Sequence, residues 1–360
     1  MGLETVLKFE LYDLGYKELL INNGLISLNG TIDDVIELNL WLRTAGRVFI
    51  DVASFNAHTF DDLFDAVQSV DWTPWLNKTS KITIDSVTTK DSDLFSKSDI
   101  QSIVKKSIIT SLQNHYRTKI IDESGEHIPI RIHAVNNQFT LRLDTSGHGL
   151  NKRGYRTRFD APLRETLAAG MIKLSRWDPA NDALIDPFCG SGTILIEAAM
   201  IANNIAPGLN QSFISEEWCI FTPNAWKNAR ESAVASQQHI PYRIYGSDIN
   251  PQILKTTRYN INRARLDNIF VETKCISNLR SRFEQGKIIS NPPYGIRLED
   301  QGATHKLYNQ MGYQFNTYFK DWHYYILSGD EQFEEYFNQK STRKRKLFNG
   351  NIRCYLHQYF

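Results

Sequence analysis

The sequence has few cysteines, and they do not form pairs. The four lie far apart along 360 residues, with no CxxC pair and no cluster of cysteines and histidines at the spacing of a zinc site; they are Cys189, Cys219, Cys275 and Cys354. This distribution argues against a disulfide framework and against a structural zinc site, and it suits a reducing compartment. We therefore expect a cytoplasmic protein that holds no metal.

Long apolar runs are also missing. No stretch approaches the ~20 apolar residues that a membrane-spanning helix needs. Met1–Glu10 carries three charged residues, which a signal peptide would not tolerate in its apolar core. With 41% hydrophobic and 22% charged residues, the composition is that of a globular protein, and the length favours more than one domain.

Charge of one sign is lacking overall, since the formal net charge is only +1. The distribution is uneven: Met1–Asp71 has a balance of −8, Trp72–Asp160 of +5, and the remainder of +4. A mildly basic middle region is compatible with contact to a polyanion and equally with ordinary surface solvation. Charge alone therefore does not define the partner.

The hydrophobic pattern divides the chain into three regions, which we place at residues 1–71, 72–160 and 161–360. The first region predicts a small α+β unit. Its strand-like runs are Thr5–Leu11 and Arg47–Ala53, and its helical patterns are Thr31–Leu42 and Phe60–Val70. The second predicts a strand, a helix and two more strands, at Lys81–Val87, Lys97–His115, Ile128–Ala134 and Gln138–Asp144. A Gly-, Lys- and Arg-rich junction at Ser146–Asp160 follows.

The third region alternates strands with helices, which predicts an α/β unit with a parallel sheet covered on both faces. The expected strands are Ala183–Asp186, Arg243–Asp248, Phe270–Thr273, Lys287–Ser290 and Tyr324–Ser328. The expected helices are Leu163–Arg176, Thr193–Ala202, Pro251–Arg265 and Lys306–Phe319. Near the end, Asn349-Gly350 between two strand-like runs predicts an antiparallel hairpin.

Two acidic residues follow strands of this sheet. Asp186 ends a strand and precedes a Gly190-Ser191-Gly192 loop, where glycines let the backbone approach a ligand. The loop lacks the lysine of a P-loop and the third glycine of a dinucleotide site, so we expect Asp186 to hold the charged amino-acid end of a cofactor. Asp248 ends the next strand, where it can accept two hydrogen bonds from a ribose diol or can cap the following helix.

The motif Asn291-Pro292-Pro293-Tyr294-Gly295 follows a third strand. An exocyclic amine of adenine or guanine is a poor nucleophile, because its lone pair is delocalised into the ring. The Asn291 carboxamide oxygen and the Pro292 carbonyl can accept its two hydrogens and aim the lone pair at an electrophilic methyl group. Tyr294 can stack on a base taken out of its helix. The alternative, a proline-stiffened turn, is disfavoured by the position after two acid-ended strands.

The glycine loop and this motif together resemble those of class I S-adenosylmethionine-dependent methyltransferases that modify amino groups of nucleobases. Other segments resemble the bacterial THUMP-domain N2-guanine methyltransferases of large-subunit (23S) ribosomal RNA. These segments are Leu94–Ser96, Gln101–Lys106, Asn151–Arg156, Ala161–Met171 and Lys344–Gly350. The resemblance spans nearly the whole chain. It implies a ferredoxin-like unit, a THUMP RNA-binding domain, and a Rossmann-like seven-stranded methyltransferase domain with a final antiparallel hairpin.

The resemblance also implies roles for individual residues. The methionine part of S-adenosylmethionine would be lined by Asp186, Phe188, Gly190, Gly192 and Thr193, while Asp248 would bind the ribose and Ile249 would lie against the adenine. The target base would be held by Asn291, Pro292 and Tyr294. Where the family commonly has an acid near the adenine amino group, this chain has Asn278, whose oxygen can still accept that hydrogen bond.

For RNA contact we expect two pairs of cations: Lys105 and Lys106 on the predicted helix of the second region, and Arg153 and Arg156 in the junction. The basic run Arg343–Lys346 is either a further RNA contact or the polar face of the hairpin. The expected reaction is methylation of guanine N2 in 23S rRNA, with tRNA as an alternative substrate. Adenine-N6 methylation of DNA and a catalytically silent RNA-binding assembly factor are the rival interpretations.

Overall fold

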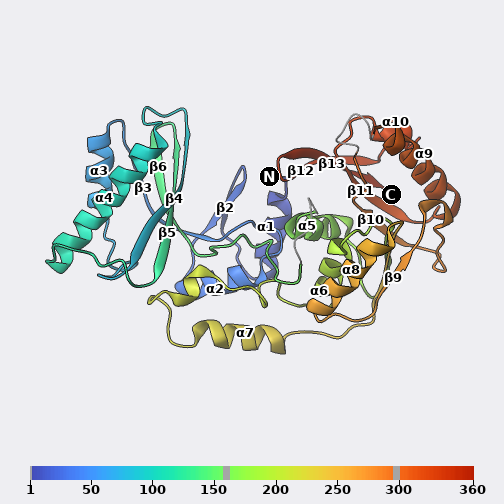
Figure 1. The fold of residues 1–360 in the computed structure, drawn as a ribbon, viewed down its shortest axis with the longest axis horizontal. Coiled ribbons are helices and arrows are strands. Elements are labelled where there is room, and N and C mark those ends of the chain that lie inside the picture. Colours follow the sequence, from blue (N-terminus) through green and yellow to red (C-terminus); the bar gives the residue numbers. More distant parts are fainter. Residues whose placement is uncertain (1, 157–162, 295–300) are drawn as a thin grey trace.

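The computed structural model describes residues 2–156, 163–294 and 301–360. Three bodies of secondary structure follow one another along the long axis of the molecule (Figure 1). A four-stranded sheet with two helices lies at one end, a small N-terminal unit lies in the middle, and a seven-stranded sheet lies at the other end. In the described part of the chain, no helix is long and apolar enough to cross a membrane.

The N-terminal unit consists of α1 (Glu4–Asp13), the hairpin β1 (Leu19–Asn22) and β2 (Leu25–Leu28), and α2 (Ile32–Trp41). The predicted strand Thr5–Leu11 is wrong, because this segment is the helix α1. Its apolar residues fit both periods, but burial selects the helical one. Leu11 is buried, whereas Phe9, which a strand would place on the same face, is 58% exposed.

The four-stranded sheet has the order β3-β6-β5-β4, formed by β3 (Phe49–Asn56), β6 (Gln138–Asp144), β5 (His127–Val135) and β4 (Lys81–Lys90). Only β4 and β5 run parallel. The helices α3 (Phe60–Gln68) and α4 (Lys97–Tyr116) cover one face of this sheet. The stretch 49–68, which the sequence pattern placed in the first region, therefore supplies an edge strand and a helix to the second body.

The seven-stranded sheet has the order β12-β13-β11-β10-β7-β8-β9. Its strands are β7 (Ala183–Asp186), β8 (Arg243–Asp248), β9 (Ile269–Thr273), β10 (Gly286–Ser290), β11 (His323–Ser328), β12 (Arg343–Asn349) and β13 (Ile352–Tyr359). All pairs from β11 to β9 are parallel, and β13 is antiparallel to both of its neighbours. The prediction of a parallel sheet with a final antiparallel hairpin is confirmed.

Helices cover both faces of this sheet. On one face α5 (Glu165–Ser175), α6 (Thr193–Ala202) and α8 (Pro251–Arg263) enclose an aliphatic core. On the other, α9 (Gln301–Tyr318) and α10 (Phe333–Tyr336) enclose an aromatic core with Phe315, Phe333 and Phe337. The chain passes from β7 outward to β9 and then returns to β10 on the other side of β7. The boundary between β7 and β10 is thus the topological switch point, where ligands of open α/β sheets bind.

The connection from α6 to β8 fastens the seven-stranded body to the rest of the molecule. It contains a 3₁₀ turn, η1 (Ile214–Glu217), and the helix α7 (Ala225–Ala235). Its aromatic residues Phe213, Trp218 and Trp226 belong to the core of the two N-terminal bodies. Trp218 Nε1 donates a hydrogen bond to the carbonyl of His127 in β5 at 2.9 Å. The predicted boundary between residues 160 and 161 lies outside the described residues.

Candidate active site

Polar side chains stand at the carboxyl ends of three adjacent strands. Asp186 is the last residue of β7, Asp248 is the last of β8, and Asn291 directly follows β10. β7 pairs with both β8 and β10, so the three residues share one edge of the sheet. The sequence predicted this grouping from strand ends alone, and the switch point lies within it.

Asp186 is 2% exposed, and its carboxylate accepts two hydrogen bonds at the same oxygen, Oδ1. Ser290 donates one from its hydroxyl at 2.5 Å, and the Phe188 backbone N–H donates the other at 3.1 Å. Burial, together with the nearby charge of Asp248, raises the pKa of Asp186 to about 7, against the lowering effect of these hydrogen bonds. A bound cation would favour the ionised form of this carboxyl.

The glycine loop is held between Asp248 and α8. The Gly190 N–H donates to Asp248 Oδ2 at 3.1 Å, and the Gly190 carbonyl accepts from the Thr257 hydroxyl at 2.5 Å. Gly192 has φ +87°, a backbone conformation that residues with a side chain rarely adopt. A Cβ there would also lie only 2.7 Å from Thr257 Cγ2, so both the backbone and the packing require glycine. A Cβ at Gly190 would meet no atom of the described residues within 4 Å, because this residue faces open space.

Three further residues were predicted to bind the cofactor, and two of them lie at the same edge of the sheet. Ile249, directly after β8, is 71% exposed, which is unusual for so large an apolar side chain. Asn278 ends η2 (Ile276–Asn278), the 3₁₀ turn after β9, and is also exposed. Thr193 begins α6 and is buried, and its hydroxyl accepts a hydrogen bond from Arg156 at 2.6 Å. Ile249 and Asn278 therefore face solvent, whereas Thr193 acts within the fold.

The Asn-Pro-Pro-Tyr segment continues from β10. Pro292 is buried and Asn291 is half-buried, and the Tyr294 hydroxyl donates a hydrogen bond to Asn291 Oδ1. The Pro293 carbonyl accepts from the Tyr308 hydroxyl at 3.0 Å. Burial raises the pKa of Tyr294 well above its ordinary value, so its hydroxyl stays a donor. Gly295, the last residue of the motif, lies outside the described residues.

Arg153 does not have the position that an RNA-contacting residue needs. Its side chain is 1% exposed and lies 3.4 Å from the equally buried Glu197 of α6. The guanidinium also donates to the carbonyls of Leu150 at 2.5 Å and Arg43 at 2.6 Å. The expectation of RNA contact is therefore wrong for Arg153 in this structure, because its donors are committed to the junction between the bodies.

Arg156 is likewise committed, with a side chain that is 16% exposed. It lies 3.3 Å from Glu165 and donates to the Leu163 carbonyl at 2.8 Å as well as to Thr193. We correct its expected role from RNA contact to support of the first turn of α6. A basic residue in a junction suggests a phosphate contact, but these two form buried pairs with α5 and α6.

The two lysines of α4 lie at the opposite end of the molecule. Lys105 pairs with Glu123 at 2.8 Å, and Lys106 is exposed with its amine 5.9 Å from the centre of the Phe64 ring. Both border a groove of about 710 Å³ between β4 and α4. Lys106 is thus accessible to a polyanion, while the charge of Lys105 is already balanced.

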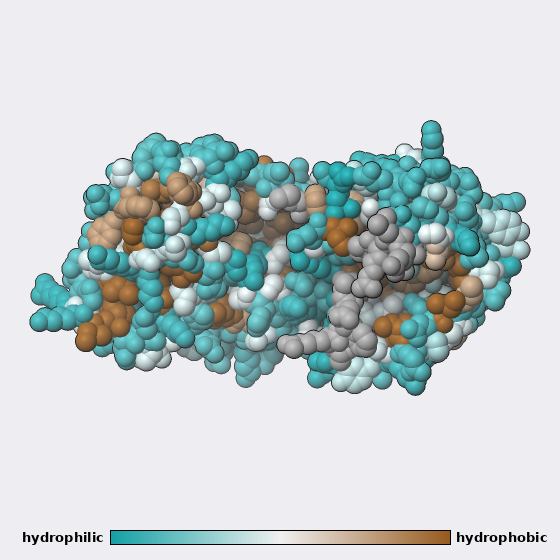
Figure 2. Space-filling view, turned by 45° about the horizontal axis from the view of Figure 1, so that its top comes forward, coloured by the Kyte–Doolittle hydropathy of each residue, from teal (hydrophilic) through white to brown (hydrophobic). Residues whose placement is uncertain are grey.

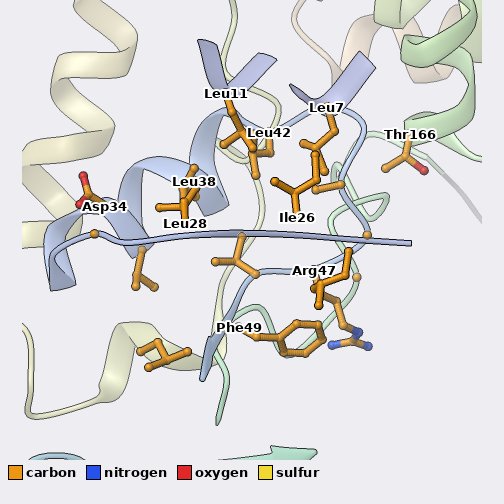
Figure 3. A pocket seen from close by; sticks show the side chains of 18 of the residues that line it. Leu7, Leu11, Ile26, Leu28, Asp34, Leu38, Leu42, Arg47, Phe49 and Thr166 are labelled. Atoms are coloured by element: carbon orange, nitrogen blue, oxygen red, sulfur yellow. The ribbon is translucent and has the colours of Figure 1, made fainter. Parts of the chain in front are cut away.

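A cleft of about 2120 Å³ opens between the N-terminal unit and the junction. Figure 3 shows Leu7, Leu11, Ile26, Leu28 and Leu38 directed into it from α1, β2 and α2. The recess between the two halves of the molecule is visible in Figure 2. None of the three strand-end residues lines this cleft. It is therefore separate from the candidate active site.

Sequence reasoning missed several residues that hold the site together. Ser290 links the end of β10 to Asp186, and Thr257 with Asn260 of α8 holds the carbonyls of Gly190 and Ser191. Ser290 directly precedes Asn291 and could have been found as a polar residue at a buried strand end. Thr257 and Asn260 carry no such signal, because polar residues on a helix usually face solvent.

A parallel sheet with acid-ended strands, a glycine loop before α6 and an Asn-Pro-Pro-Tyr segment at the switch point defines a class I methyltransferase, the class that uses S-adenosylmethionine. The family model of the RMKL-like methyltransferase domain matches residues 153–358. Models of the RlmL ferredoxin-like domain and of the THUMP domain match residues 1–49 and 57–144. The chain belongs to the RMKL-like methyltransferase family, and the predicted family and enzyme class are confirmed.

Individual relatives agree with this assignment. "Putative RNA methyltransferase YpsC" of Bacillus subtilis is 40% identical over all of this chain and 94% of its own length. "Ribosomal RNA large subunit methyltransferase K/L" of Psychromonas ingrahamii is 33% identical over 99% of this chain, which spans only 49% of that protein. The solved structure of SMU.472, described as "a putative methyltransferase complexed with SAH", has a TM-score of 0.95 and 36% identity, with 100% of this chain and 95% of that chain covered.

Proposed function

We propose that this enzyme transfers a methyl group from S-adenosylmethionine to the exocyclic N2 amine of a guanine in RNA. Large-subunit rRNA is the favoured substrate and tRNA the alternative, and the cytoplasm is the proposed location. One observation carries the proposal: Ser290 joins the buried acid Asp186 directly to Asn291, its neighbour in the chain. A cofactor acid and a base-holding amide thus stand side by side at the switch point.

The residues at this edge fit S-adenosylmethionine. The raised pKa of Asp186 means that its buried charge is uncompensated, and the ammonium group of the methionine part would compensate it. Asp248 would accept hydrogen bonds from the ribose, and the exposed Ile249 would be covered by the adenine. Asn278 would accept from the adenine amino group. The open space at Gly190 gives the methionine part room close to the backbone.

The residues of this chain would position the exocyclic amine of the target base and would not remove a proton from it before the transfer. When bound, S-adenosylmethionine supplies the electrophilic methyl group. Asn291 Oδ1 and the Pro292 carbonyl would accept the two amine hydrogens, which localises the nitrogen lone pair and stabilises the positive charge that develops there. One proton then leaves the nitrogen for water.

The Tyr294 hydroxyl and a target amine would use the same acceptor. That acceptor is Asn291 Oδ1, which the hydroxyl occupies in this structure. A carboxamide oxygen has two lone pairs, so Asn291 can accept from both, or the ring can turn to stack on the base. Before the base arrives, the hydrogen bond from the Tyr294 hydroxyl fixes the orientation of the Asn291 carboxamide.

The experiment measures tritiated methyl transfer to 23S rRNA, tRNA and DNA isolated from a strain that lacks the gene, followed by nucleoside mass spectrometry. We expect N2-methylguanosine in 23S rRNA. Label in tRNA alone would select the alternative substrate, and N6-methyladenine in DNA would replace the proposal. No label in any nucleic acid, with 23S rRNA still bound by the protein, would indicate a catalytically silent RNA-binding protein.

A further inference from the structure

The hairpin β12–β13 carries a row of cations and aromatic rings on one face. The register places Lys346 opposite Tyr355 and Phe348 opposite Arg353. Side chains that are directly opposite in an antiparallel pair lie on the same face, so these four residues form one surface with Lys344. β12 is the edge strand of the sheet. In Figure 1 it lies beside the N terminus, on the side of the sheet toward the other two bodies.

The cations lie close to the rings. The amine of Lys346 is 5.5 Å from the centre of the Phe348 ring, and the Lys344 amine is 5.1 Å from that of Tyr355. The Arg353 guanidinium lies 6.0 Å from the same Tyr355 ring. The three cationic residues are exposed, and both rings are half-buried. This hairpin face, defined by Lys344, Lys346, Phe348, Arg353 and Tyr355, thus alternates charge with flat apolar surface.

Two of the three cations already have partners. Lys344 pairs with Glu334 at 2.9 Å, and Arg353 pairs with the exposed Glu331. In the described part of the chain Lys346 has no carboxylate partner. Exposed ion pairs are weak and open readily, so Arg353 can exchange Glu331 for another anion. The hairpin face therefore offers one free cation and one easily freed cation beside the rings.

The turn end of the hairpin lies at the same edge of the sheet as the candidate active site. A Cβ added at Gly329, directly after β11, would lie 3.3 Å from Tyr294 Cδ2 and 3.4 Å from Ile352 Cγ2. The same atom would be 3.6 Å from the Arg353 carbonyl oxygen. The base-holding segment and the start of β13 are thus close neighbours across Gly329. Arg353 and Phe348 are the members of the hairpin face next to this turn, because they directly flank Ile352 and Asn349 in the pairing of the two strands.

We propose that the hairpin face binds the single-stranded RNA next to the target nucleotide. Flanking bases stack on Phe348 and Tyr355, and Lys346 and Arg353 contact the phosphates between them. The inference rests on the proposed function and adds to it a surface that selects a flexible, unpaired stretch of RNA. A surface with cations and stacking rings recognises single strands because every base has a π-face, whereas a duplex hides its bases.

Three variants test the proposal in the full-length enzyme. Tyr355→Leu removes the ring, Tyr355→Phe keeps it, and Lys346→Gln removes the free charge. Lys320→Gln is the matched control, an exposed lysine at the amino end of β11, opposite the site. The measurements are KM and kcat for 23S rRNA from the deletion strain, the salt dependence of binding to that RNA, and calorimetric affinity for S-adenosylhomocysteine.

Tyr355→Leu should raise KM about tenfold, within the range for loss of one stacked base, while Tyr355→Phe and Lys320→Gln stay at the wild-type value. Lys346→Gln should lower the log–log salt slope by about 0.7, the value for one phosphate contact on a single strand. Affinity for S-adenosylhomocysteine should be unchanged throughout.

Three outcomes overturn the proposal. If the wild type methylates rRNA and all variants keep its KM and salt slope, the hairpin face does not bind RNA and the proposed function stands alone. If Tyr355→Leu also weakens S-adenosylhomocysteine binding and Lys346→Gln keeps the wild-type slope, the effect is one of folding. If the wild type methylates no RNA, the proposed function fails and the inference fails with it.

Discussion

The Ser290 hydroxyl donates a hydrogen bond to Oδ1 of Asp186 at 2.5 Å. This bond joins β10 to β7 at the topological switch point of the sheet. The next residue after Ser290 is Asn291, so a single hydrogen bond ties the residue proposed to hold the cofactor to the residue proposed to hold the base. Both partners are buried. This hydrogen bond opposes a shift of β10 against β7, which would displace Asn291 relative to Asp186.

The protonation of Asp186 should control cofactor binding. Its pKa is raised to about 7 in the unliganded protein, and an ammonium group needs the ionised carboxylate. Below pH 7, binding must first release the proton, so affinity falls as pH falls; above pH 7 this effect ends. Calorimetric titration with S-adenosylhomocysteine should show about tenfold weaker affinity at pH 6 than at pH 8.

Asp186→Asn is the control for this prediction, since it still accepts the Ser290 hydrogen bond but cannot titrate. We expect weaker binding with little change over the same pH range. A wild-type affinity that does not change with pH would contradict the assignment.

Asp186 also affects the stability of the unliganded protein. Because its pKa in the folded protein is the raised one, its contribution to stability is present below its ordinary pKa of 3.8 and is lost as pH rises through about 7.

Asp248 should contribute mainly to the ribose contact. Asp248→Ala removes a charge-assisted acceptor and should weaken S-adenosylhomocysteine binding by about 1.5–3 kcal/mol. The carboxylate also accepts from the Gly190 and Asn250 N–H groups, so part of the loss reflects a loosened loop. Asp248→Asn keeps one acceptor oxygen, so its affinity for S-adenosylhomocysteine should lie between those of the wild type and Asp248→Ala. Unchanged affinity in both variants would remove Asp248 from the site.

Asn291 should affect the rate and not cofactor affinity. Asn291→Ala removes one preorganised acceptor and should reduce single-turnover methyl transfer by about 100-fold or more. Tyr294→Phe removes only the hydroxyl that occupies Asn291 Oδ1, so it should retain binding of S-adenosylhomocysteine and a rate much nearer that of the wild type. An Asn291→Ala rate close to that of the wild type would contradict the proposed role.

The sequence was sufficient to predict the parallel sheet and the three residues at its edge. Buried strands read as short apolar runs, and Asp186, Asp248 and Asn291 each stand directly after one. These are local signals, so no knowledge of distant contacts was needed. The Asn349-Gly350 turn gave the hairpin in the same way.

What the sequence could not predict depends on contacts between distant segments. Arg153 resembles a surface cation until Glu197, 44 residues later, is known to be buried against it. The segment of α1 fits a strand and a helix equally well, and only packing against the rest of the N-terminal unit selects the helix. Ser290 acquires its role from Asp186, 104 residues earlier in the chain.

The buried pair of Arg153 and Glu197 makes a prediction about stability. Arg153→Ala should leave an uncompensated carboxylate in the interior and lower the free energy of unfolding by about 3–5 kcal/mol. Arg153→Met combined with Glu197→Gln removes both charges but keeps the acceptor for the Tyr155 hydroxyl, so it should recover most of the loss. Chemical denaturation measures both. Equal losses in the single and double variants would show that the lost guanidinium hydrogen bonds to Leu150 and Arg43, and not the unpaired carboxylate, account for the destabilisation.

The two lysines of α4 should differ in their effect on RNA binding, although the sequence presents them as equivalent neighbours. Lys105 is paired with Glu123, and its hydrogen bond lowers the pKa of that carboxyl, so the pair is neutral and partly screened. Lys106 is exposed and has no carboxylate partner in the described part of the chain. Only Lys106 is therefore free to neutralise a phosphate and release counterions.

Lys106→Gln should lower the log–log salt slope of binding to 23S rRNA by about 0.7–0.9, the value for one phosphate contact. The double variant Lys105→Gln with Glu123→Gln removes one charge of each sign and should keep the wild-type slope. Neither should alter which base atom is methylated, because α4 lies at the far end of the molecule from β10, the strand that Asn291 directly follows (Figure 1). Equal slopes for the wild type and Lys106→Gln would show that this face of α4 does not contact the RNA backbone, and substrate selection would have to be sought elsewhere on the chain.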